Sequence, residues 1–387
     1  MPPALRHRAF AIFWVAAATS AVGTWMQNVA RAWVIYRQTD DPLWLGWLGA
    51  SVAIPMIVLP VIGGSLVDRF DRARVLVVTQ LLGIAVAVAL AALSFAGALR
   101  PWQLLVASAV SAVALAADNP ARQALVSELV PAADLDSAVA LSAASFQVAA
   151  MIGPALAGLV LHALGPAWCF LLNAMSFVGL LLVLPTLPRP ASPRRGRASL
   201  ADALALPRVR ALLLVAAIVA IGARSYPQLL PLVARALDGE ARTYGFLLSA
   251  SGVGAVGAAI VLSTRAAIDD RTRDRAIRRA LLALAISLGA LAAAPSRIVA
   301  LLSLVAAGAS ATATTTGIAA ALQHAAAPAV RGRVLGLYAT TLIGLPWLGS
   351  LFGAALSRAL SVRTALLLAA ATALAARWSR RGVTHAA

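Results

Sequence analysis

A succession of long apolar runs, broken by short polar stretches, extends over the whole of this 387-residue chain. A helix needs about 20 consecutive, mostly apolar residues to cross a lipid bilayer, and twelve runs of roughly that length can be distinguished. With 61% hydrophobic and 12% charged residues, the chain is far more apolar than a soluble domain, which is about half apolar and about a quarter charged. The sequence therefore excludes a water-soluble globule and predicts an all-α membrane protein with short connections.

The apolar runs predict twelve transmembrane helices, six on each side of a polar linker. The first run follows Arg6 and Arg8 as a signal peptide would, but its apolar pattern continues for a full bilayer span. The predicted helices are Ala9–Tyr36, Trp44–Val67, Ala73–Leu99, Gln103–Asn119, Ser137–Leu164, Ala167–Pro185, Val209–Ala236, Tyr244–Ser263, Ile277–Ala293, Val299–Gln323, Val334–Leu360 and Ala365–Trp378. We therefore expect a six-helix bundle at residues 1–187, a cytoplasmic linker rich in Pro, Arg and Ser at 188–207, and a second six-helix bundle at 208–387.

The distribution of arginine predicts how the chain is oriented in the membrane. All 32 basic residues are arginine, and with the N-terminus inside, 23 fall on the cytoplasmic side and 9 on the opposite side. Basic residues accumulate in the cytoplasmic loops of membrane proteins. Both termini and the linker are therefore expected in the cytoplasm, and the net charge of +18 is attributed to topology and not to a nucleic-acid partner.

Residue types that are scarce or missing exclude several kinds of chemistry. The chain has no lysine, which a Walker A phosphate loop and a Schiff-base cofactor both require. Its single cysteine, Cys169, excludes an internal disulfide and a multi-cysteine metal site. We therefore expect neither a cofactor nor a metal site, and no ATP-driven pump within this chain.

A weak internal repeat supports two related halves. At a shift of 199 residues, Gly23 falls on Gly222 and Gly46 on Gly245, and at a shift of 196, Gly153 falls on Gly349. Such matches are common in a chain rich in Ala, Gly and Leu, but the shift agrees with the position of the linker. Two pseudo-symmetric bundles of six helices are one of the known plans of transporters.

Polar side chains are concentrated on every third predicted helix, namely the first, fourth, seventh and tenth. The first helix carries Thr24, Gln27, Asn28 and Arg31 at spacings of three and four, which places them on one face. Because polar groups are costly in hydrocarbon, such a face marks a protein interior or a water-filled path. The candidate substrate-binding residues are Gln27, Asn28, Arg31, Gln147, Arg224, Tyr226, Gln228 and Thr316. The third, ninth and twelfth helices are nearly apolar, as supports facing lipid would be.

Each of these polar residues also has a structural interpretation. A Ser or Thr hydroxyl in a helix commonly bonds to its own backbone. Arg31 and Arg224 lie in the outward halves of their helices and could extend to the outer interface. Alternatively, they supply positive charge in a central cavity that attracts an anionic or phenolic substrate, or they hold an ion pair.

The turn after the second helix, GGSLVDRFDRARVL, contains Gly64, Asp68, Arg69 and Arg72. Its alternating carboxylates and guanidiniums can form bidentate pairs that break and re-form when one bundle moves. The pattern closely resembles the GxLxDRxGRR loop that the major facilitator superfamily has between its second and third helices. Asp71 stands where that family often has glycine.

Further stretches resemble one branch of that superfamily, which includes enterobactin exporters, macrolide efflux proteins and transmembrane secretion effectors. These stretches are GTWMQNVARAW, AADNPARQALVSELVP, AASFQVAAMIGPALAGLVL, AWCFLLNAMSF and RGRVLGLY. The run GPALAG, with Gly153, Pro154 and Gly158, is similar to the helix 5 signature of antiporters in the superfamily. Physically, its glycines permit close helix contact and its proline frees a backbone carbonyl.

The resemblance implies a monomeric exporter in the bacterial inner membrane that expels a small amphipathic organic molecule, such as a siderophore or a drug, in exchange for protons. The candidate gating and coupling residues are Gly64, Asp68, Arg69, Arg72, Asp118, Arg122, Gly153, Pro154 and Gly158. Asp118 is the one acidic residue clearly inside a predicted helix, and the position beside the first-helix tryptophan, acidic in some relatives, is Thr24. The proton carrier could therefore be Asp68, Asp118 or the substrate itself.

Two other classes of function are kept as alternatives. An intramembrane enzyme would need a buried nucleophile with a base, but the four histidines lie in the tails or near helix ends. The other alternative is a membrane partner protein that transports nothing. The only argument against it is that the chain leaves no room for a large domain outside the membrane that could transmit a signal.

Overall fold

The computed structural model describes residues 2–67, 72–187, 206–264 and 269–379, and these residues form helices joined by short turns. Helix is the expected result, because the bilayer core supplies no partner for an unpaired backbone N–H or C=O group. The α-helices are α1 (Arg8–Thr39), α2 (Leu43–Val67), α3 (Arg72–Phe95), α4 (Pro101–Leu129), α5 (Leu135–Ala163), α6 (Pro166–Val183), α8 (Pro207–Ile221), α9 (Leu230–Leu237), α10 (Ala241–Ser263), α11 (Asp270–Ala292), α12 (Arg297–Ala325), α13 (Pro328–Ala359) and α14 (Val362–Ser379).

Four short 3-10 helices complete the described part of the chain. They are η1 (Pro3–Arg6), η2 (Ala132–Asp134), η3 (Leu184–Thr186) and η4 (Tyr226–Leu229). Nine spans among the described residues are long and apolar enough to cross a membrane, and the described apolar part of α2, Leu43–Leu59, is shorter. With α8, η4 and α9 counted as one interrupted helix, the helical segments correspond to the twelve predicted ones.

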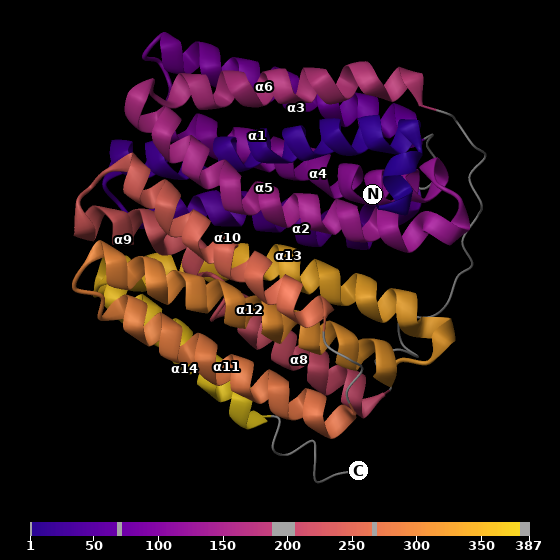
Figure 1. The fold of residues 1–387 in the computed structure, drawn as a ribbon. Coiled ribbons are helices and arrows are strands. Elements are labelled where there is room, and N and C mark those ends of the chain that lie inside the picture. Colours follow the sequence, from indigo (N-terminus) through magenta and orange to yellow (C-terminus); the bar gives the residue numbers. More distant parts are fainter. Residues whose placement is uncertain (1, 68–71, 188–205, 265–268, 380–387) are drawn as a thin grey trace. The chain divides into compact units, whose positions relative to one another are not determined.

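The chain divides into two compact units. The first comprises Met1–Asp40, Ile54–Pro193 and Gly239–Ser249, so it contains α1, α3, α4, α5 and α6. Within it, α1 packs against α5 and α6, while α3 packs against α4 and α6. Figure 1 shows α3 and α6 side by side in this unit. Helix α1 also contacts α4, so it lies against three other helices and is the central element of the first unit.

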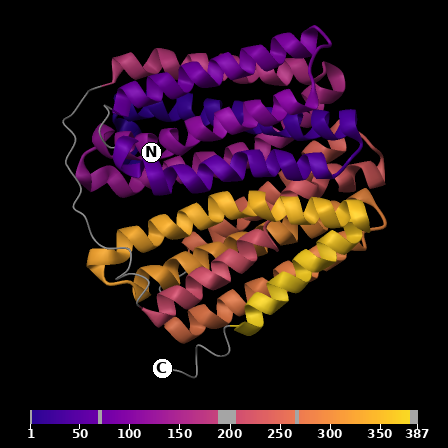
Figure 2. The ribbon, with the colours of Figure 1, turned by 180° about the vertical axis from the view of Figure 1, so that it is seen from behind.

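The second unit comprises Asp41–Ala53, Arg194–Asp238 and Ala250–Ala387. Within it, α11 packs against α12 and α14, and α13 packs against α8 and α14. Figure 2 shows α13 and α14 of this unit from behind. Helix α11 begins at a cap in which the Asp269 carboxylate accepts a hydrogen bond of 3.3 Å from the Thr272 backbone N–H. The predicted linker at 188–207 lies almost entirely outside the described residues.

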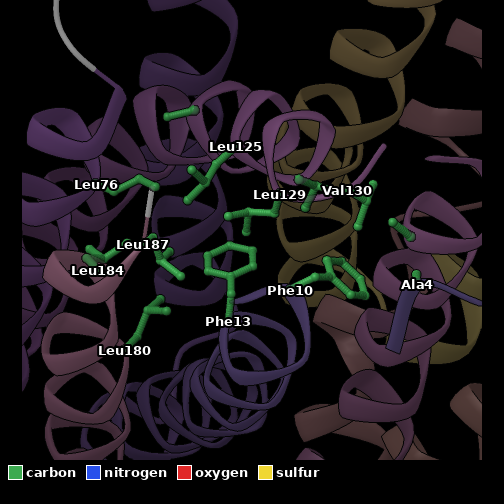
Figure 3. Close-up of a cluster of buried hydrophobic side chains, with 13 residues drawn as sticks. Ala4, Phe10, Phe13, Leu76, Leu125, Leu129, Val130, Leu180, Leu184 and Leu187 are labelled. Atoms are coloured by element: carbon green, nitrogen blue, oxygen red, sulfur yellow. The ribbon is translucent and has the colours of Figure 1, made fainter. Parts of the chain in front are cut away.

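A cluster of large apolar side chains closes one end of the first unit. The ends of α4 and α6 and the starts of α1, α3 and α5 contribute to it. Figure 3 shows leucines gathered round the buried ring of Phe13, and the fully buried Phe10 lies in the same cluster. His7 is bonded to Asp134 over 2.7 Å next to this cluster, which joins the N-terminal segment to the start of α5. Since lipid tails are as apolar as leucine, van der Waals contact within this cluster, not removal from water, stabilises it.

Two helices differ most from the sequence prediction, and α11 and α13 also begin seven and six residues earlier than expected. Helix α4 was expected to end at Asn119, but it continues through Pro120 to Leu129. A proline is tolerated there because neighbouring helices and local adjustments satisfy the freed backbone group. The predicted continuous helix Val209–Ala236 is wrong: α8 ends at Ile221 with Gly222 as its C-cap, η4 follows at Tyr226–Leu229, and α9 begins at Leu230. The glycine, together with the two prolines that follow it in YPQLLP, accounts for the interruption.

Candidate functional site

A buried polar cluster lies between α1 and α4 in the first unit. Gln27 and Arg31 come from successive turns of α1, and each side chain is 4% exposed. The Arg31 Nη2 donates a hydrogen bond of 2.8 Å to the Ser111 hydroxyl, and Ser108 lies one turn before Ser111 on α4. The burial of Arg31 excludes the interpretation that it extends to the outer interface. Asn28 is half-buried beside this cluster.

The positive charge of Arg31 has no carboxylate within ion-pair distance in the part of the chain that the structure describes. Its Nε is buried without a hydrogen-bond partner, as are the Gln27 Oε1 and the Ser108 hydroxyl. A buried charge is normally paired, and a buried polar atom is normally hydrogen-bonded. The ion-pair alternative considered for Arg31 is therefore not supported by the described residues.

The interrupted helix of the second unit holds a similar pair of side chains. Arg224 lies in the turn after α8, and Gln228 lies four residues further, in η4. The Arg224 Nε and the Gln228 Oε1 are both buried without a partner among the described atoms. Each unit thus contains one arginine and one glutamine, four residues apart, with the same two atoms unpaired.

Two tyrosine side chains of the second unit lie within electrostatic range of Arg224. The Tyr226 hydroxyl lies 2.6 Å from the Ser251 hydroxyl of α10, and Tyr226 is 3% exposed. The Tyr338 hydroxyl of α13 donates a hydrogen bond of 2.6 Å to the Thr315 carbonyl of α12. The Arg224 charge acts electrostatically on both tyrosines. Sequence reasoning named Tyr226 but missed Ser251 and Tyr338, because the contacts between helices depend on how each helix is rotated.

The remaining two predicted binding residues are less enclosed. Gln147 on α5 is half-buried, and Thr316 on α12 is exposed in this structure. The neighbouring Thr314 and Thr315 bond to carbonyls of their own helix, which is the structural interpretation given for such hydroxyls. The structure therefore brings Gln27 and Arg31 together in one cluster and Arg224, Tyr226 and Gln228 in another, but it gives Gln147 and Thr316 no hydrogen bond in either cluster.

The Asp118 carboxylate is the centre of a third polar cluster, between α3 and α4. Asp118 is 5% exposed, and its Oδ1 accepts hydrogen bonds of 2.8 Å from both the Thr79 hydroxyl and the Gln80 amide. Its Oδ2 accepts a hydrogen bond from the Arg122 Nε, one turn further on α4. The Gln80 Oε1 has no partner among the described atoms. Sequence reasoning missed Thr79 and Gln80 because it took their helix as nearly apolar, although this polar pair interrupts the apolar run.

The charged turn between α2 and α3 is only partly described. Gly64 lies in the last turns of α2 and Arg72 is the first residue of α3, whereas Asp68 and Arg69 lie outside the described residues. Among the described residues, the Asp118 carboxylate is bonded to Arg122, Thr79 and Gln80.

The glycines of the GPALAG run lie at close helix contacts within the first unit. A Cβ at Gly153 would lie 2.6 Å from the Trp25 Cβ of α1, and one at Gly158 would lie 3.1 Å from the Gly245 Cα of α10. The Pro154 carbonyl faces Gly245 at the same crossing. Such short approaches require residues without a side chain. The glycines of GPALAG therefore lie where helices are in close contact, as expected from the sequence.

The comparisons with known proteins all lead to membrane transporters. A family model described as transmembrane secretion effector, of the major facilitator type, matches residues 2–381. The chain is 24% identical over 251 residues to the staphyloferrin A transporter of Staphylococcus aureus. That match covers 62% of this chain and 63% of the relative, so the chain spans less than two thirds of the relative's length.

Two solved structures resemble the chain over almost its whole length. A bacterial homologue of the human lysosomal transporter Spinster has a TM-score of 0.73 at 14% identity, covering 98% of this chain and 96% of that one. A variant of the nucleoside transporter NupG has a TM-score of 0.76 at 13% identity, covering 97% and 99%. At such identities the likeness shows the fold alone, and that fold is the two-bundle, twelve-helix arrangement expected from the sequence.

Proposed function

Because the chain belongs to the transmembrane secretion effector family of the major facilitator superfamily, we propose that it exports a small amphipathic organic molecule in exchange for protons. Membership of the family makes the protein a multi-pass membrane transporter and not an intramembrane enzyme. Its substrate is a small molecule, and siderophores, drugs and similar metabolites are the proposed candidates. The first of these classes agrees with the name of the staphylococcal relative, the staphyloferrin A transporter.

The observation that carries proton coupling is the environment of Asp118. A buried carboxylate inside a membrane helix is costly, and such groups commonly mark proton paths. When Asp118 is ionised, it accepts three hydrogen bonds, from Thr79, Gln80 and Arg122. When it is protonated, rotation of the Gln80 amide would present the unpartnered Oε1 as an acceptor for the new O–H group. The cluster can therefore accommodate both protonation states.

The direction of transport is inferred from α5. The antiporter resemblance of GPALAG supports export, and the tight crossings at Gly153 and Gly158 give the run a physical role. In the proposed cycle, the bundles at 1–187 and 208–387 rock against each other to expose the substrate site on alternate sides. The proposal places the monomer in a bacterial inner membrane with both termini in the cytoplasm, as the arginine distribution predicts.

Purified protein in liposomes, with and without an imposed pH gradient, tests the proposal. A panel of siderophores, macrolides and dyes supplies the substrates, and movement of substrate is followed together with movement of protons. We expect the gradient to drive substrate toward the acidic side, against its own concentration gradient. Substrate movement that is the same with and without the gradient would refute proton antiport.

Asp118→Asn identifies the carrier in the same assay. We expect this variant to lose gradient-driven accumulation and to retain exchange of labelled for unlabelled substrate, because exchange needs no net proton movement. Asp136→Asn is the matched control, since Asp136 is exposed at the start of α5. Gradient-driven accumulation by Asp118→Asn at the wild-type level would show that another group carries the proton.

A further inference from the structure

The polar cluster between α1 and α4 has three hydrogen-bonding atoms that no described residue satisfies. They are the Gln27 Oε1, the Arg31 Nε and the Ser108 Oγ. All three side chains are at least nine-tenths buried, with exposed fractions of 4%, 4% and 1%. Leaving such an atom unpaired is unfavourable, and more so for a charged group. The cluster is therefore incomplete without a partner that the protein itself does not provide.

The three side chains come from adjoining turns of two helices that contact each other. Gln27 and Arg31 are four residues apart on α1, so their side chains are neighbours on one face. Arg31 contacts α4 through its hydrogen bond of 2.8 Å to Ser111. Ser108 is three residues before Ser111, which makes it a neighbour on the same face of α4.

The chemistry of the unpaired atoms defines the missing partner. The Arg31 Nε–H is a charged donor and the Ser108 hydroxyl can donate, so two donors face an anion with two acceptor oxygens. The Gln27 Oε1 is an acceptor, so the same partner needs a donor next to its anionic group. We propose that this cluster binds the carboxylate of a 2-hydroxy acid, with Arg31 and Ser108 on the carboxylate and Gln27 accepting from the 2-hydroxyl. This inference rests on the proposed export function, because it names the substrate class of that site.

Two alternative occupants fit the cluster less well. Water could bond to Ser108 and Gln27, but it would leave the Arg31 charge uncompensated, and a buried charge without a counter-ion is strongly unfavourable. A 2-amino acid could also donate to Gln27, but its ammonium group would bring a second positive charge next to Arg31. A 2-hydroxy acid satisfies the donors, the acceptor and the charge at once. Because the cluster is buried, the anion would enter in a conformation that opens this face of the first unit.

Binding of two small probes to the full-length protein in lipid nanodiscs tests the proposal directly. The probes are mandelate and phenylacetate, which differ only in the 2-hydroxyl group. We expect mandelate to bind about tenfold more tightly, since a site built to accept a hydroxyl proton leaves its acceptor unpaired with the analogue that lacks it. Arg31→Gln should weaken both probes at least tenfold. The exposed Arg279→Gln on α11 is the matched control and should change neither affinity.

Gln27→Met tests whether the Gln27 Oε1 accepts a hydrogen bond from the 2-hydroxyl of the bound acid, and it separates this role from any effect on folding. Methionine has a similar length but lacks the amide oxygen, so the tenfold preference for mandelate should disappear while phenylacetate binding is retained. The ratio of the two affinities does not depend on the fraction of protein that is folded. Equal binding of both probes by the wild type, or wild-type affinities in Arg31→Gln, would overturn the proposal.

The binding test is independent of the transport test. It needs no pH gradient and no movement of substrate across a membrane. Failure of gradient-driven export with mandelate binding intact would refute the antiport function and leave the subsite standing. Export of dyes or macrolides by a protein that does not bind mandelate would refute the subsite and leave the export function standing.

Discussion

The pairing of Asp118 with Arg122 leads to a quantitative prediction about stability. The two side chains are 8% and 21% exposed, so the pair is mostly removed from solvent. Removing one partner of a buried pair costs about 3–5 kcal/mol, because the other charge is left without compensation. In Asp118→Asn the remaining guanidinium reaches solvent in part, so we expect the lower end, about 3 kcal/mol of the free energy of unfolding.

Arg122→Gln should cost about as much, for a related reason. It leaves the Asp118 carboxylate with two neutral donors, the Thr79 hydroxyl and the Gln80 amide, and no counter-charge. The double variant has neither charge, so it should be more stable than the sum of the two losses predicts. The resulting coupling free energy should be about 2 kcal/mol, in the range found for residues that share one polar network.

Reversible unfolding of the purified protein by SDS, measured for the wild type, both single variants and the double variant, checks this cycle. The pair Arg297–Asp238 is the control in the same chain, because its atoms are 3.6 Å apart and its side chains are 46% and 26% exposed. Such exposed pairs contribute about 0.2–1 kcal/mol. If the losses from Asp118→Asn and Arg122→Gln simply add, the two side chains are not coupled and the interpretation of the cluster is wrong.

Three further changes have expected outcomes. Gly153→Leu should abolish export, because the new side chain would separate α5 from α1. Gly179→Leu is the control and should leave export unchanged, because a side chain added there meets open space. Transport in liposomes measures both variants. Tyr226→Phe should lower the free energy of unfolding by about 1 kcal/mol, because the Ser251 hydroxyl loses its partner, and SDS unfolding measures the loss. Hydrogen bonds from Thr272, chiefly from its hydroxyl and then from its backbone N–H, lower the pKa of Asp269 below its usual 3.8. The contribution of Asp269 to the stability of α11 is therefore complete above that value, and it disappears as the pH falls through the lower folded pKa. Asp269→Asn keeps a cap that does not titrate, so hydrogen exchange in the first turn of α11 should lose this acid dependence.

The helices could be located from the sequence because a membrane span has a simple physical requirement. About 20 apolar residues in a row are needed, and few other structures produce such a run. The two largest errors both occur at proline. The prediction ended the fourth helix at Asn119, and it ran the seventh helix through Gly222 and Pro227. Whether a proline ends a membrane helix or is tolerated in it depends on neighbouring helices, which a sequence does not specify.

The polar sites could be predicted only in part, for a related reason. Spacings of three and four identified the shared face of Gln27 and Arg31, because this is a property of one helix. The hydrogen bonds from Thr79 and Gln80 to Asp118 connect two helices, and they depend on the rotation of α3 relative to α4. The Thr79 hydroxyl gives no clear signal by itself, since a hydroxyl in a membrane helix commonly bonds to its own backbone, and the Leu76 carbonyl, 3.0 Å away, competes with Asp118 for its one proton.

Helix α4 contributes to two polar clusters of the first unit, the one around Arg31 and the one around Asp118. Ser111, which holds Arg31, and Asp118, which is bonded to α3, are seven residues apart on this helix. Seven residues are almost two full turns, so the two side chains lie on one face, about 10 Å apart along the axis. A tilt or rotation of α4 that loosens one set of contacts therefore changes the geometry of the other. A change in the protonation of Asp118 and the arrival of an anion at Arg31 would then act on the same rigid element, which is the physical requirement for coupling between two sites.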